Sequence, residues 1–219
     1  MNGKESDMNK GTIAERAGTV IALGAVWGLA ECALGAGLQA CAKSISGSLM
    51  TGVALFFVAA AWAASKRALD VALLVGIAVL FKMFDALLLG LPLGSGAVAN
   101  PAFAFVLEGA GFLVAASLIG RSRSERTSGR VLMGGAGAFL AVASFPLVGF
   151  VTGNAACLAA GTSIPLAWYY GPIAVALSLL TVPLGMRFGE RARIFESRVL
   201  VPSLALALSL ALMVVFRRI

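Results

Sequence analysis

The sequence predicts an all-α fold, a polytopic transmembrane helical bundle of six to seven spans. Hydrophobic residues make up 60% of the chain and charged residues 12%, and the mean hydropathy is +0.96. One soluble domain of 219 residues has far less apolar surface to bury than this composition supplies. The apolar residues also fall into separate runs, most of them long enough to cross a hydrocarbon core of about 30 Å.

Taken in order, the runs define a short cytosolic tail at residues 1–16 and one transmembrane domain at residues 17–216. The first run is too long for the core of a signal peptide, so it is expected to be a retained helix. If the last run does not cross, the bundle has six spans and a peripheral final segment. The expected spans cover residues 17–40, 48–64, 69–91, 98–120, 131–153, 164–186 and 199–216.

The gaps between the runs alternate in charge. When alternate gaps are grouped, 13 of the 17 lysines and arginines fall on one side of the membrane and three on the other, with Lys82 inside a span. The positive-inside rule then places the N-terminus in the cytosol and the two uncharged loops outside, as expected in the inner (plasma) membrane of a prokaryotic cell. The net charge of +7 follows from this topology, and no nucleic-acid partner is expected.

Four ionisable residues interrupt the apolar runs: Glu31, Lys82, Asp85 and Glu108. At about 1.5 Å per residue from the cytosolic end of each span, all four lie about 18 to 24 Å into a core about 30 Å thick. Charged groups at that depth cost several kcal/mol unless they pair, face a cavity or serve a function. The agreement in depth predicts one shared polar layer in the middle to outer half of the membrane.

The helical spacing indicates which spans meet in this layer. Glu31 shares a stripe with Gly24, Gly28, Gly35 and Gln39, and Glu108 shares one with Ala104, Gly111 and Ala115. Small residues at such spacing allow helices to approach closely. Lys82 and Asp85 are three residues apart and therefore neighbours on one helix. We expect spans one, three and four to meet with their charges directed at one another.

Two interpretations of these charges remain open. The acids could pair with Lys82 in a polar cluster that only fixes helix register. Alternatively, three carboxylates against one ammonium leave a site for a cation, a proton or a polar solute. Residues of the outer loops could form its mouth, while Trp168, Tyr169 and Tyr170 are more typical of an interfacial belt. The candidate substrate-binding residues are Glu31, Gln39, Lys82, Asp85, Asn100, Glu108 and Asn154.

Missing residue types narrow the chemistry. The chain contains no histidine and no GxxxxGK[ST] motif, and its three cysteines form no CxxC pair. A Ser-His-Asp hydrolase, a zinc site and a P-loop ATPase are therefore not expected, nor is any cofactor. A membrane enzyme acting on lipid or isoprenoid is a minor alternative, with the acids holding Mg²⁺, but paired Asp-rich motifs are absent. Whether the acids bind a metal stays open.

Three short segments carry a resemblance: Val26-Trp27-Gly28-Leu29-Ala30-Glu31, Phe81-Lys82 and Val106-Leu107-Glu108-Gly109. Together with the compact bundle and the absence of an ATPase motif, they resemble the substrate-binding S components of energy-coupling factor (ECF) transporters, or related small prokaryotic membrane proteins. The S components usually have six spans, so a seventh would depart from that pattern.

The resemblance implies capture of a small solute from outside and transfer through a transmembrane coupling subunit driven by two cytosolic ATPases. It also implies a docking surface of small residues on the first helix, for which Ala14, Gly18, Ala22 and Ala25 are candidates. The same four residues could equally pack within the fold.

Two other functions are compatible with the sequence. An ion- or proton-coupled carrier or channel would use Glu31, Asp85 and Glu108 as a relay and would work without an ATPase partner. A structural or assembly subunit of a membrane complex would need none of these groups for binding.

Overall fold

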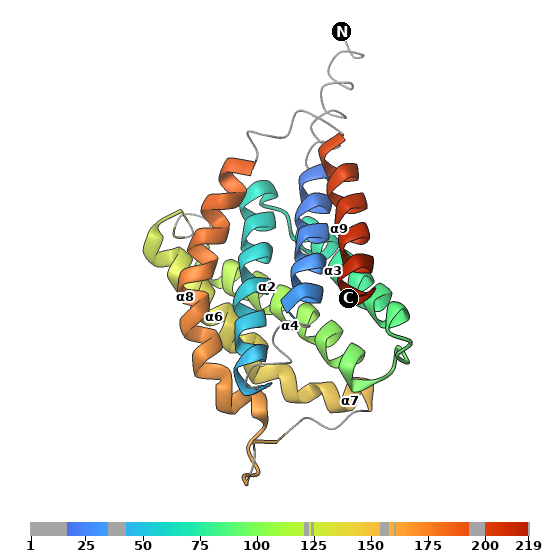
Figure 1. Cartoon of the computed structure of the whole chain (residues 1–219). Helices are drawn as coiled ribbons and strands as arrows, with labels where there is room; N and C mark the ends of the chain where they lie inside the picture. Colours follow the sequence, from blue (N-terminus) through green and yellow to red (C-terminus); the bar gives the residue numbers. More distant parts are fainter. Residues whose placement is uncertain are drawn as a thin grey trace.

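The computed structural model describes residues 17–34, 43–120, 123, 125–153, 158–159, 161–192 and 200–218, and the fold is all-α (Figure 1). Six helical segments are long and apolar enough to cross a membrane, so the chain is a multi-pass membrane protein. We call the first of them, Ala17–Leu34, the N-terminal helix. The other elements are α2 (Lys43–Ser65), α3 (Ala68–Leu88), α4 (Gly96–Ile119), α6 (Thr127–Ser144), a 3₁₀ turn η1 (Phe145–Leu147), α7 (Val148–Thr152), α8 (Leu166–Ala192) and α9 (Leu200–Arg218).

The last helix behaves differently from the six spans. The apolar stretch of α9, Pro202–Phe216, is shorter than any of them. It lies along the flank of the N-terminal helix (Figure 1), where Pro202 contacts Gly18 and Met213 is fully buried beside Ala25 and Phe81. The structure therefore matches the six-span alternative with a peripheral final helix.

Several boundaries differ from those expected. The helix α2 begins at Lys43, five residues before the predicted start, and α8 continues through Arg187 to Ala192. Basic residues at the end of a span do not oppose helix formation, so hydropathy marks where the apolar run stops rather than where the helix stops. The fifth span, Thr127–Val151, changes to a 3₁₀ turn at Pro146. Proline has no backbone N–H to donate to an α-helical hydrogen bond, which favours this change. Pro172 and Pro183 lie within α8 without ending it.

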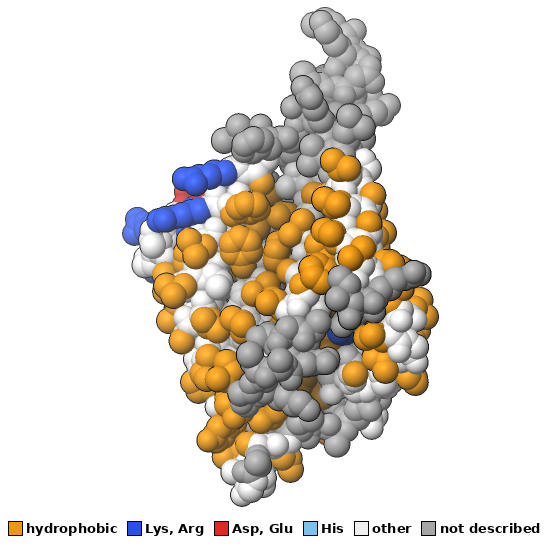
Figure 2. All heavy atoms as spheres, in the orientation of Figure 1, with side chains coloured by type: hydrophobic (Ala, Val, Ile, Leu, Met, Phe, Trp, Pro, Cys, Tyr) orange, Lys and Arg blue, Asp and Glu red, His pale blue; other side chains and the backbone are white. Residues whose placement is uncertain are grey.

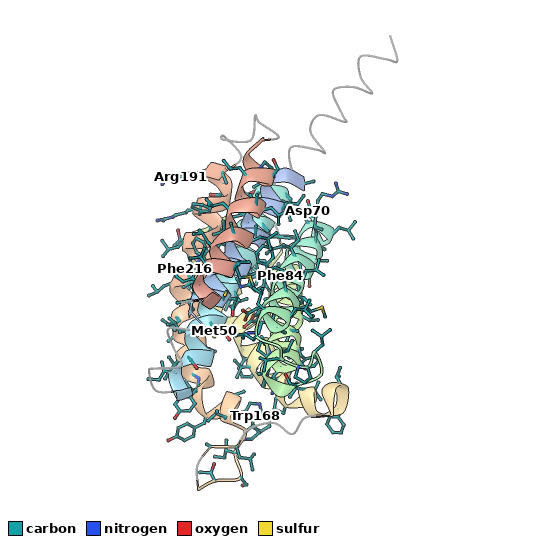
Figure 3. The ribbon with its side chains drawn as sticks, turned by 45° about the vertical axis from the view of Figure 1, so that its right-hand side comes forward. Met50, Asp70, Phe84, Trp168, Arg191 and Phe216 are labelled. Atoms are coloured by element: carbon teal, nitrogen blue, oxygen red, sulfur yellow. The ribbon has the colours of Figure 1, made fainter. Side chains whose placement is uncertain are left out.

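The two ends of the bundle differ in charge. We call the end carrying Lys66, Arg67, Arg130 and Arg191 the basic end, and the opposite end, at the 89–95 hairpin and the 161–165 segment, the neutral end. Figure 2 shows lysine and arginine side chains gathered at one end above a surface rich in hydrophobic side chains. Figure 3 shows Arg191 and Asp70 toward one end of the bundle and Trp168 toward the opposite end. This arrangement agrees with the alternating charge of the gaps.

Glycines set the tightest helix contacts. On α8, Gly185 and Gly189 lie against the backbone carbonyls of Phe56 and Ala60 on α2, so a β-carbon at either position would overlap backbone. On α6, Gly134 lies equally close to the carbonyl of Ser178 on α8. Such contacts let helices approach as closely as their backbones permit. They join α2, α6 and α8 in the half of the bundle nearer the basic end.

Candidate functional site

A cavity of about 410 Å³ opens between the same helices toward the neutral end. Its volume is within the range of sites that hold small ligands. The lining comes from the parts of α2, α4, α6 and α8 nearest the neutral end, with one residue from the N-terminal helix. The polar members are Glu31, Ser46, Ser48, Thr51, Asn100, Glu108 and Tyr170, and the apolar members include Met50, Pro101, Ala104, Phe105, Val142, Phe145 and Ala174.

Glu31 reaches this cavity from the N-terminal helix. Its side chain is 3% exposed, and Trp27 Nε1, one turn earlier, donates a hydrogen bond of 3.2 Å to Glu31 Oε1. Trp27 is itself fully buried, with its ring 5.1 Å from the ring of Phe105 and 6.4 Å from that of Phe57. Packing of the indole therefore fixes the direction in which the Glu31 carboxyl points.

Glu108 reaches the cavity from the middle of α4. It is 4% exposed, and the Thr51 hydroxyl on α2 hydrogen-bonds its carboxyl. Its Oε2 atom has no hydrogen-bond partner among the described residues, and neither has Oδ1 of Asn100, which also lines the cavity. A buried acceptor left unpaired costs about 1–3 kcal/mol. Two residues of the cavity lining thus each carry a buried acceptor atom that the described protein does not satisfy.

Glu31 and Glu108 lie close enough for their charges to interact. In a region of low dielectric, two carboxylates at short range repel strongly when both are ionised. Among the described residues, the cavity lining contains no lysine or arginine to offset them. Its electrostatic character therefore favours a cation or a bound proton.

Lys82 and Asp85 form a separate cluster on α3. Lys82 Nζ lies 3.5 Å from Asp85 Oδ2, and Cys32 Sγ donates to Asp85 Oδ1 at 3.6 Å. Asp85 is 2% exposed, whereas the Lys82 side chain is 16% exposed. Neither residue lines the cavity, although Lys82 is near enough to Glu31 for their charges to interact. The four predicted charges are thus close together but divide into a cavity pair and an ion pair.

The predicted helix contacts are confirmed in part. Gly24 and Gly28 of the N-terminal helix pack against Ile77 and Phe81 of α3, so spans one and three meet as expected. On α4 the stripe divides: Ala104 and Glu108 line the cavity, while Gly111 packs against the backbone of α6 at Gly137. A close approach of α4 to α6 was not predicted.

Most of the cavity wall was also missed. The residues Ser46, Ser48 and Thr51 of α2 and Tyr170 of α8 are part of it. Polar residues recurring in the first turns of an otherwise apolar span were the signal for α2. Of the three aromatics at the start of α8, Trp168 and Tyr169 are exposed as an interfacial belt requires, and only Tyr170 lines the cavity.

The remaining candidates have mixed outcomes. Asn100 lies in the first turns of α4 and lines the cavity, while Gln39, Asn154 and Ala14 lie outside the described residues. On the face suggested for docking, Gly18 contacts Pro202, Ala25 is fully buried and Ala22 is partly exposed. In this structure, two of these small residues therefore pack within the fold.

Among the described residues, no group of three or more acidic, histidine or cysteine side chains could hold a metal ion. Comparisons with protein-family models, with curated proteins and with solved structures give no match to this chain. A functional assignment therefore rests on the cavity and its chemistry.

Proposed function

We propose that this chain is the solute-binding component of a membrane transport system, and that it binds a small polar or cationic solute in the cavity at the neutral end. The observation that carries the proposal is Glu108, which lines a cavity of about 410 Å³ and whose buried Oε2 atom has no partner among the described residues. Unpaired carboxyl groups at membrane depth are costly, and a bound solute would offset that cost.

The ion pair on α3 supports solute binding over a purely structural cluster. Lys82 forms its ion pair with Asp85, and although its charge also reaches Glu31, one ammonium is shared between Asp85 and the cavity pair. A register-fixing cluster would be expected to satisfy its own polar atoms, because an unsatisfied buried network is less stable than an apolar contact. The cavity pair does not meet that expectation.

The energy source in this proposal is a partner. As in an ECF transporter, a transmembrane coupling subunit with two cytosolic ATPases would act on this chain in the inner membrane of a prokaryote, since the sequence lacks a P-loop. The coupling subunit would approach the N-terminal helix at Ala22, between Gly18 and Ala25. Because α9 covers Gly18 and Ala25, docking on all three would require α9 to move. Membrane lipid would contact the exposed apolar surface (Figure 2).

One observation favours a second candidate, an ion- or proton-coupled carrier that works alone. Glu108 and Glu31 interact, and Glu31 also interacts with Lys82, so ionisable groups follow one another from the cavity to α3. Successive ionisable groups within a membrane are typical of proton relays. Proton-dependent solute flux in liposomes containing only this chain would favour the carrier over the partner-driven component.

Thermal unfolding of the purified protein in detergent tests the proposal. The protein would be heated with vitamins, cofactors, amines and metal ions, in the wild type, in Glu108→Gln and in the exposed control Glu190→Gln. A solute at a hundredfold excess over Kd would stabilise the fold by about 2.7 kcal/mol. We expect a shift that Glu108→Gln loses and Glu190→Gln keeps. The absence of any shift would instead support a structural or assembly subunit.

A further inference from the structure

We infer that the cavity binds an elongated organic monocation, with an ammonium or amidinium group at one end, an apolar middle and a neutral hydrogen-bond donor at the other end. This inference rests on the proposed function and specifies the class of solute. It follows from the positions of the unpaired acceptors, from the apolar wall between them and from the absence of basic residues in the part of the lining that the structure describes.

The cationic end belongs between Glu31 and Glu108. Both carboxyls are almost completely buried and both line the cavity, and Glu108 Oε2 has no partner among the described residues. An ammonium or amidinium donates several charge-assisted hydrogen bonds, which are about twice as strong as neutral ones. A divalent metal fits less well, because the described residues provide no third acidic, histidine or cysteine ligand there.

The donor end belongs beside Asn100. This residue lies eight positions before Glu108 on the same helix, about 12 Å nearer the neutral end. Its Oδ1 atom is buried and has no partner among the described residues. An amide oxygen accepts a hydrogen bond but carries no charge, so a hydroxyl or amide N–H satisfies it at a lower desolvation cost than a second ammonium would.

Between these ends the wall is apolar. Ala104 and Phe105 of α4 face the cavity together with Val142 and Phe145 near the end of the fifth span. Such a wall stabilises a hydrocarbon skeleton by about 25 cal/mol per Å² of apolar surface buried. The two phenylalanine rings can also attract a cation through their faces. An inorganic ion would leave this part of the cavity unfilled.

Trp27 provides a direct readout of binding, because its indole N–H is hydrogen-bonded to Glu31. In a Trp62→Phe/Trp168→Phe variant, Trp27 becomes the single tryptophan. This variant would be titrated in lipid nanodiscs with ω-amino alcohols of increasing chain length. The n-alkylamines, n-alkanols and n-alkanoates of the same lengths serve as controls for partitioning into lipid. Thermal unfolding of the wild type with the same compounds gives a second measurement.

We expect saturable changes in Trp27 emission with the amino alcohols and affinity at least about tenfold higher than for the matching alkanols. An optimum at an intermediate chain length is expected, because the acceptors are fixed in separation. Glu108→Gln should remove the preference for the amine. Asn100→Leu should remove the preference for the terminal hydroxyl while keeping the preference for the amine, which a merely structural role of Asn100 would not do.

Equal binding of alkanols and amines would overturn the inference and indicate a lipid chain in the cavity. Stronger binding of alkanoates would also overturn it, because it would show that the cavity prefers an anion. If a compound other than an amine stabilises the protein and depends on Glu108, the solute-binding function stands and this inference fails. If no compound in either experiment binds, both fail.

Discussion

The basic and neutral halves of this bundle are built from the same helices, but the helices are in close contact in the basic half and separated in the neutral half. Toward the basic end, Gly185 and Gly189 bring α8 against the backbone of α2, and Gly134 brings α6 against α8. Toward the neutral end, the same three helices and α4 separate around the cavity. The position of small residues along a helix therefore decides where the bundle is closed and where it can hold a ligand.

The difference is also one of polarity. In the basic half, which we call the closed half, these backbone contacts leave no room for a side chain between the helices. Glu31, Glu108 and Asn100 instead line the cavity toward the neutral end, in what we call the open half. Helix backbones that touch cannot separate without losing extensive van der Waals contact, which is the main force between helices in lipid. The glycine contacts of the closed half thus fix the helices that surround the cavity in the open half. The following substitutions test this dependence.

The largest effect is expected from Gly189→Leu. Its β-carbon alone would overlap the carbonyl group of Ala60, so α8 must move away from α2, at a cost of about 3 kcal/mol or more. The exposed Gly76→Leu is the matched control, because no heavy atom outside the adjacent backbone of its own helix lies within 4 Å of a β-carbon there. Thermal unfolding in detergent measures both. Equal stability of the two variants would contradict the proposed role of the closed half.

Breaking the ion pair should have the next largest effect. In Lys82→Met, Asp85 keeps Cys32 as a partner but loses the ammonium group, and we expect a loss of about 2 kcal/mol in stability. Because removing both charges leaves no unpaired carboxylate at position 85, Lys82→Met/Asp85→Leu should recover most of this loss. If the double variant is less stable than both Lys82→Met and Asp85→Leu, the ion pair itself stabilises the fold.

Filling the cavity separates binding from stability. Leucine at Ala104 would occupy space beside Glu108, so the affinity for any solute bound there should fall by about tenfold or more, roughly 1.4 kcal/mol. The free energy of unfolding should remain within about 1 kcal/mol of wild type, because the added carbon atoms enter an existing cavity. Ala110→Leu, at an exposed position of α4, is the control. Unchanged binding in Ala104→Leu would place the solute elsewhere.

The smallest effect is expected at the basic surface. Arg130 and Glu190 form a two-bond ion pair between α6 and α8, at 2.6 Å and 3.2 Å, but the Glu190 side chain is 41% exposed. Exposed pairs contribute about 0–1 kcal/mol, and salt screens them. Glu190→Gln should therefore lower stability by less than about 1 kcal/mol, a difference that shrinks in high salt. A larger loss would mean that charge, in addition to glycine packing, closes this half.

The sequence predicted six to seven spans, and it was sufficient for the order and the charge asymmetry of the six that the structure shows. Hydropathy did not separate the seventh run, residues 199–216, from these spans, although its apolar stretch in α9 is shorter. Hydropathy and the positive-inside rule act on single segments, so each span could be recognised without its neighbours. The depth of Glu31 and Glu108 followed in the same way, from their position along one helix. The 3₁₀ turn at Pro146 is a local effect of the same kind, because proline acts on the backbone of its own segment.

The sequence was not sufficient for the partners of each helix. Gly111 and Ala104 are on one stripe of α4, but the first contacts α6 and the second faces a cavity. Periodicity shows that one face of a helix consists of small residues, but it does not show which helix packs against that face. For the same reason Thr51 could not be placed beside Glu108, and Lys82 could not be assigned to Asp85 rather than to a glutamate.

The Lys82–Asp85 pair has a consequence for how the chain enters the membrane. Its members are three residues apart on α3, so they can meet as soon as that helix forms, before any other span is present. Glu31 and Glu108 have no cation within four residues on their own helices, so each crosses the insertion machinery without such a partner. A charge at the centre of a span costs about 2.5–3.5 kcal/mol at that step. Membrane insertion therefore carries a free-energy cost for the two carboxyl groups that line the cavity.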